Sequence, residues 1–155
     1  MRNLGYLIAV ILTVIALIHA YWAFGGLWPG HDVQSLINAV MGDPNRTKMP
    51  PTWLTLLVAG LIGATALIGW SAGRAHRNRG IGPMWLNRIG AGGVGLVFVA
   101  RAVLGFLIAA GYVALPQTEP FASLDLRFYS PLCLALGLGF WTLAFMPRTQ
   151  RSLSG

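Results

Sequence analysis

The stretch that decides the fold runs from residue 87 to residue 113 and reads NRIGAGGVGLVFVARAVLGFLIAAGYV. It is long enough to cross a bilayer, because a membrane-spanning helix needs roughly 20 mostly apolar residues. Arg101 is the only charge in its interior, since Arg88 marks its start. An arginine at the centre of such a helix costs about 2.5–3.5 kcal/mol on insertion scales. The cost implies a partner, a hydrated cavity or a function for this side chain.

Three further apolar runs have a comparable length, at residues 4–24, 52–72 and 129–146. The chain of 155 residues is 55% hydrophobic and 10% charged, whereas a soluble domain carries about 25% charged residues. Its mean hydropathy is +0.65. The sequence therefore predicts an all-α fold, an integral membrane four-helix bundle that forms one domain over residues 1–155.

The charges are distributed unevenly along the chain. If the four helices alternate in direction, all four acidic residues lie on one side of the membrane and most basic residues lie on the other. The positive-inside rule then predicts that both termini are cytoplasmic. The net charge of +7 follows from this orientation and from attraction to anionic lipid, so no nucleic-acid partner is predicted. The basic residues on the predicted cytoplasmic side are Arg2, Arg74, Arg77, Arg79, Arg88, Arg148 and Arg151.

A short amphipathic helix is predicted in the first outer loop, residues 25–51. Its apolar residues follow the spacing of one helix face, and Asp32 and Gly42 are suited to begin and end the helix. We expect it to lie on the outer surface with its apolar face down, as a lid over the bundle or as a plug that shields helix ends. The apolar residues are Val33, Leu36, Ile37, Val40 and Met41.

The start of the last helix is ambiguous in the sequence. Ser130-Pro131 is typical of a helix N-terminus, but a helix that begins there is only about 24 Å long at 1.5 Å per residue. Either residues 121–128 continue it with a proline kink, or this loop dips into the bundle. Both alternatives bring Asp125 and Tyr129 close to the outer membrane boundary.

Glycines lie on the second and third runs at spacings that favour close helix packing. These are Gly69-x-x-x-Gly73 and the cluster at residues 90–95, and we expect them to bring these two helices together. The cluster also matches the dinucleotide-binding fingerprint, but that motif requires a preceding strand, which is absent from the pattern here.

Arg101 is expected to point toward the outer side, where every acid lies. Asp125 is the best candidate for its counter-ion and Glu119 is the second. A structural clamp and a ligand-binding site account equally well for such a pair.

His19 lies in the outer third of the first run, with Trp22 one turn beyond it. It is interpreted either as a histidine bonded to a neighbouring helix or as a residue that binds a ligand or handles protons. No second histidine lies in a membrane run and no metal-ligand spacing occurs, so neither metal nor cofactor is predicted. Cys133 is the only cysteine, which excludes a paired-thiol redox site.

Three segments together resemble a bacterial family of small four-helix integral membrane proteins catalogued only as a domain of unknown function. They are residues 19–30, HAYWAFGGLWPG, then Arg101-Ala102, and finally residues 125–134, DLRFYSPLCL. The resemblance covers nearly the whole chain. It implies the fold, a multi-pass location and a bacterial inner membrane, and it implies no activity.

The leading hypothesis is a protein that binds a lipid-like or polar/anionic small molecule in an outward-facing pocket. One alternative is a membrane enzyme acting on a lipid or isoprenoid, with His19 as acid/base and Arg101 as electrostatic stabiliser. The other is a structural subunit of a membrane complex. The expected partners are membrane lipids, the small molecule, and a homo- or hetero-oligomer. The candidate ligand-binding residues are His19, Trp22, Trp28, Arg101, Asp125 and Tyr129.

Overall fold

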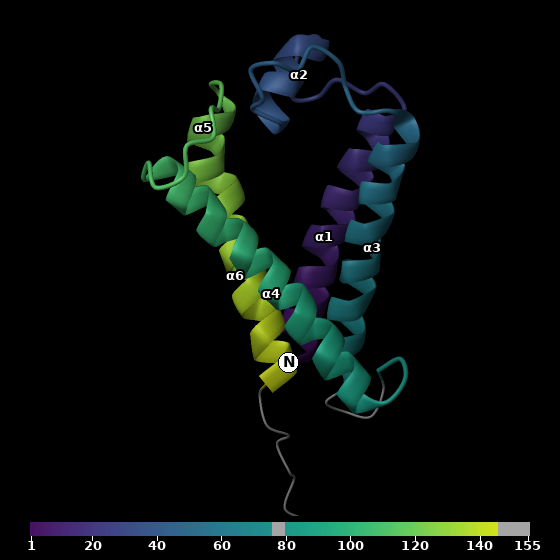
Figure 1. Cartoon of the computed structure of the whole chain (residues 1–155). Helices are drawn as coiled ribbons and strands as arrows, with labels where there is room; N and C mark the ends of the chain where they lie inside the picture. Colours follow the sequence, from purple (N-terminus) through teal and green to yellow (C-terminus); the bar gives the residue numbers. More distant parts are fainter. Residues whose placement is uncertain (76–79, 146–155) are drawn as a thin grey trace, which may run out of the picture.

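A computed structural model describes residues 1–75 and 80–145 of the chain. Every regular element in these ranges is helical (Figure 1). Four stretches are long and apolar enough to cross a membrane, namely α1, α3, α4 and the continuous run from α5 to α6. The predicted all-α membrane fold is thus confirmed. The elements are α1 (Arg2–Ala23), α2 (Val33–Val40), α3 (Thr52–Ala75), α4 (Met84–Ala109), α5 (Phe121–Leu124), the π-helical turn η1 (Asp125–Tyr129) and α6 (Ser130–Phe145).

The four long helices alternate in direction, so the bundle has two distinct ends (Figure 1). Met1, the end of α3 and the start of α4 lie at one end, called the basic end because Arg2, Arg74 and Arg88 lie there. The opposite end, called the α2 end, carries α2, the α4–α5 loop and all four acids. The assignment of the basic end to the cytoplasm stays a prediction from charge.

The long helices form two pairs, α1 with α3 and α4 with α6. In the first pair a Cβ added to Gly5 would lie 2.7 Å from the Gly69 oxygen and 2.8 Å from the Gly73 Cα. In the second pair a Cβ added to Gly95 would lie 3.0 Å from the Gly137 oxygen. Small residues on both helices are therefore what allows the two backbones of each pair to approach.

The glycines of the second and third runs were predicted to bring these two helices together. This prediction was wrong about which helices the glycines pack against. Gly69 and Gly73 pack against α1, and Gly95 packs against α6. Of these two glycine sets, Gly90 is the one beside α3, where an added Cβ would lie at an ordinary contact distance of 3.5 Å from Ile68. The reason is that a glycine patch needs a second small residue opposite it, and α1 and α6 supply these at Gly5 and Gly137.

The two pairs meet through a common core near the basic end. Its buried members come from all four long helices, and Phe98 stacks on Phe140 with ring centroids 6.1 Å apart. Toward the α2 end the two pairs lie apart (Figure 1). The buried core residues are Ile8, Leu12, Ala66, Ala72, Ala91, Leu136, Phe140, Leu143 and Ala144.

The predicted amphipathic helix in the first loop is confirmed as α2. Asp32 accepts a hydrogen bond from the Ser35 backbone N–H at 2.7 Å, and the Ser35 hydroxyl accepts one from the Asp32 N–H at 3.0 Å. Gly42 follows the helix with a φ of +67°, the left-handed conformation that glycine adopts at helix ends. Leu36 and Ile37 are fully buried, whereas Val33 at the start of the helix is exposed, so the centre of the apolar face of α2 is packed.

The last helical run begins earlier than residue 129 and extends over residues 121–145. Of the two alternatives from the sequence, the helical continuation is the one observed. The Ser130 N–H donates to the Asp125 carbonyl, five residues back, which makes the turn π-helical. Pro131 has no N–H, and in a regular α-helix its ring would crowd the carbonyl four residues before it. The wider turn immediately before Pro131 accommodates this ring.

Candidate functional site

Arg101 forms an ion pair with Asp125, the counter-ion expected first from the sequence. Arg101 Nη2 lies 2.6 Å from Asp125 Oδ1, and the carboxylate is nearly fully buried, with 3% of its side chain exposed. The Ser130 hydroxyl donates to the same oxygen at 3.2 Å. Glu119, the second candidate, is instead bonded to the Ser123 hydroxyl. The pair joins the middle of α4 to the π turn of the last helix.

The cluster also includes Ser130 and Gly105, two residues that were not among those predicted for the site. The π turn brings Ser130 beside Asp125, because its backbone bond links residues five apart. On α4, Gly105 leaves room for the pair, since a Cβ there would lie 2.8 Å from Asp125 Oδ2 and 2.9 Å from Arg101 Nη1. The four-residue step from Arg101 to Gly105 was the available signal, because such residues share a helix face.

The face of α4 that carries Arg101 is the face that packs on the first pair nearer the basic end. A Cβ added to Gly90 would be in contact with Ile68 of α3, and Val94 packs against the common core. Arg101 lies seven residues after Val94, which is two helical turns along the same face. Arg101 therefore extends this face beyond the core toward the α2 end.

The face of α1 that carries His19 also packs in the core and continues beyond it toward the α2 end. Ile8 and Leu12 are buried in the core, and Ile15 packs against it. His19 continues their steps of three and four residues, which places it on the same face one turn farther out. The two faces that meet in the core thus lead outward to His19 on one pair and to Arg101 on the other.

The remaining predicted site residues lie in two separate groups. His19 Nδ1 donates to the Ile15 oxygen at 2.8 Å, its ring lies 4.9 Å from that of Trp22, and Trp22 Nε1 donates to the Trp28 oxygen at 2.7 Å. Tyr129 belongs to the Arg101–Asp125 side. Between the two groups, the described part of the chain forms no hydrogen bond, ion pair or ring contact.

Tyr129 connects the last helix to α2. Its hydroxyl donates to the Ala39 oxygen of α2 at 3.1 Å, and its ring lies 5.7 Å from that of Phe121. Beside this contact, the Thr118 N–H donates to the Gly42 oxygen at 2.9 Å. The end of α2 is therefore held on the second helix pair, next to the Arg101 cluster.

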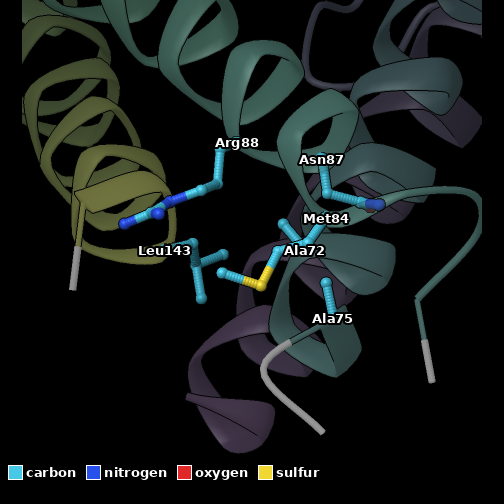
Figure 2. A pocket seen from close by; sticks show the side chains of 6 residues that line it. All are labelled: Ala72, Ala75, Met84, Asn87, Arg88 and Leu143. Carbon is cyan, nitrogen blue, oxygen red and sulfur yellow. The ribbon is translucent and has the colours of Figure 1, made fainter. Parts of the chain in front are cut away.

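Two surface hollows lie away from Arg101. The first, at the basic end, has space for about 10 Å³ between α3, α4 and α6, and Arg88 crosses it to donate from Nε to the Ala144 oxygen at 2.7 Å (Figure 2). That volume holds about one water molecule. The second is a shallow apolar groove of about 360 Å³ on α1. It is lined by Val14, Leu17, Ile18, Tyr21 and Trp28.

Within residues 1–75 and 80–145, no three His, Cys, Asp or Glu side chains come together in a group that could hold a metal ion. Compared with known proteins, residues 12–140 match a family described as "Protein of unknown function (DUF3995)". No curated protein and no solved structure matches the chain.

Proposed function

The chain belongs to this DUF3995 family and has four helices long and apolar enough to cross a membrane, and we propose that it binds an amphiphilic small molecule whose head group meets Arg101. The body of the ligand lies between the α2-end halves of the two helix pairs. The protein acts in this proposal as a binding or accessory protein in the membrane.

The exposed part of the Arg101 side chain is the observation that carries the proposal. Asp125 has 3% of its side chain exposed, whereas Arg101 retains 38%. Arg101 precedes Ala109, the end of α4, by about 12 Å along the helix axis at 1.5 Å per residue. A partly exposed arginine at that depth needs water or a polar ligand, because hydrocarbon offers its N–H groups no acceptor.

The surroundings suit an amphiphile better than a water-soluble ligand. On α4, the residues that precede Arg101 on its helix face are apolar. On α1, the face that carries Ile15 continues to His19 and Trp22. Aromatic and aliphatic side chains supply the apolar contacts that a ligand body requires, while a few polar groups orient its head. His19 accords with such a role, because its Nδ1–H bond to the Ile15 oxygen leaves Nε2 of a neutral ring as an acceptor.

Native mass spectrometry of the purified protein, followed by lipid analysis of what is released, tests the proposal. We expect the wild type to retain an amphiphile that the double variant Arg101→Leu/Asp125→Leu loses. The double variant removes both charges together, so no buried charge is left unpaired. Arg46→Leu is the matched control, because Arg46 pairs with Asp43 at 3.7 Å on the exposed surface.

A wild-type protein that carries no bound amphiphile contradicts the proposal. So does a double variant that is folded and binds the same molecule as the wild type, since Arg101 would then serve only as a clamp. Loss of a co-purifying protein from the double variant, with no bound small molecule in either, points instead to the structural-subunit alternative.

A further inference from the structure

Resting on the proposed function, we infer that the head group is an uncharged hydrogen-bond acceptor, such as a quinone or ester carbonyl, because the guanidinium that meets it is already neutralised by a buried carboxylate. An arginine without a counter-ion could bind either an uncharged or an anionic head group, and the buried carboxylate favours the uncharged one.

The ion pair has no net charge at the point where the ligand arrives. Arg101 Nη2 and Asp125 Oδ1 are 2.6 Å apart, and Ser130 adds a neutral hydroxyl at 3.2 Å from the same oxygen. A phosphate brought to this guanidinium would also approach the carboxylate, and the repulsion between two like charges offsets its attraction to the cation. A carbonyl oxygen meets no such repulsion.

The guanidinium nevertheless keeps donors to offer. It carries five N–H groups in a planar fork, and the bond to Asp125 is made from Nη2. With 38% of its side chain exposed, Arg101 can donate to a neutral acceptor while the pair stays intact. The pair therefore acts as an oriented set of donors rather than as a positive charge.

Among the described residues, Asp125 is ion-paired with Arg101, and Arg46 and Asp43 form the other ion pair. Of the other basic residues at the α2 end, Arg46 pairs with Asp43 and Lys48 is exposed in the same loop. Arg127 is exposed two residues after Asp125 on η1, about half a turn away from the face that meets Arg101. Strong anion sites use charge-assisted bonds from uncompensated cations, and this arrangement offers none.

The test compares two amphiphiles with the same chain, a decyl-substituted benzoquinone and decyl phosphate. Binding to the full-length protein in phosphatidylcholine nanodiscs is measured by titration calorimetry, with empty nanodiscs subtracted. We expect the wild type to favour the quinone by about tenfold or more, which corresponds to 1.4 kcal/mol. Asp125→Asn should reverse the preference, because it removes the compensating charge and keeps the side-chain shape. Asp43→Asn removes the same charge at the surface and should keep the wild-type preference.

The outcomes separate the two proposals. A wild type that favours decyl phosphate, or an Asp125→Asn variant with unchanged preference, overturns the inference and leaves the proposed function standing. Binding of neither probe by the wild type counts against both. Should Asp125→Asn fail to fold, Asp125→Glu provides the second variant, since it keeps the charge and must keep the preference for the quinone.

Discussion

At the scale of single residues, the Arg101–Asp125 pair is a compromise between attraction and desolvation. Two unit charges 4 Å apart attract by about 4 kcal/mol at an effective dielectric constant of 20, and burying the carboxylate costs several kcal/mol. The Ser130 hydroxyl offsets part of that cost. Because the Asp125 carboxylate is nearly fully buried while Arg101 is more than a third exposed, the carboxylate depends on the arginine for its stabilisation more than the arginine depends on the carboxylate.

Arg101→Leu is expected to lower the free energy of unfolding by about 1–3 kcal/mol, because it leaves Asp125 buried without its ionic partner. Adding Asp125→Asn to this variant should recover most of the loss. Unfolding followed by circular dichroism during titration with a denaturing detergent measures both. Arg46→Leu serves as the control, since an exposed pair contributes about 1 kcal/mol or less. A double variant no more stable than Arg101→Leu would show that the two charges are not coupled.

Asp32 gives a pH-dependent contribution at the start of α2, outside the membrane spans. The backbone N–H of Ser35 and then its hydroxyl hold the pKa of Asp32 below the ordinary value of 3.8. Because this folded pKa lies below the unfolded one, the stabilisation is present above pH 3.8 and is lost as the pH falls through the folded pKa. We expect an NMR titration of the Asp32 carboxyl to show a midpoint below 3.8. Ser35→Ala should raise it, and a wild-type midpoint at or above 3.8 would contradict the capping geometry.

At the scale of helices, the hydrophobic runs were predicted well and their partners were not. A long apolar run satisfies its backbone hydrogen bonds inside hydrocarbon by forming a helix, so each of the four helices follows from length and composition. Which helices pair depends on small residues facing each other, and Gly5 and Gly137 had no distinguishing pattern in the sequence. The last helix shows the same limit, because its π turn arises from the neighbourhood of Pro131 rather than from hydrophobicity.

Gly73→Ala is expected to destabilise the α1–α3 pair by about 1–3 kcal/mol, since overpacking at a close contact forces the backbones apart. The added Cβ would lie 2.9 Å from the Cα of Gly5. Gly60→Ala is the matched control on the same helix, because a Cβ there meets nothing within 4 Å, and alanine favours helix by up to about 1 kcal/mol over glycine. Thermal unfolding of the two variants in one detergent gives the comparison. Equal melting temperatures would exclude a close α1–α3 contact at Gly73.

At the scale of the whole molecule, two helix pairs share a core near the basic end and α2 lies at the other end. The pairs diverge toward α2 (Figure 1), and α2 is held on the second pair by Tyr129 and Thr118. This arrangement puts the polar residues of the proposed site in the half of the bundle that lies beyond the common core. Charge asymmetry predicts that this half faces away from the cytoplasm.

Cysteine labelling tests that orientation. In a Cys133→Ser background, Asn45→Cys at the α2 end should react with a membrane-impermeant maleimide in intact bacterial cells. Ile81→Cys, in the exposed loop at the basic end, should react only after the membrane is permeabilised. The physical reason is the excess of basic residues near Ile81, which are retained on the cytoplasmic side during insertion. The opposite labelling pattern would invert the orientation and place the proposed site on the cytoplasmic side.

The sequence by itself determined the four membrane helices and the amphipathic α2 with its Asp32 cap, and it ranked Asp125 ahead of Glu119 as the partner of Arg101. These follow from local rules: apolar length, helical spacing, and the need of a buried charge for the nearest opposite charge. Only the tertiary structure decided the helix pairs, the contribution of Ser130 and Gly105 to the ion pair, and the separation of His19 from Arg101 into two groups. An apolar helix in lipid can pack against many other helices with almost the same energy. Which helices pair therefore depends on contacts between residues far apart in the chain.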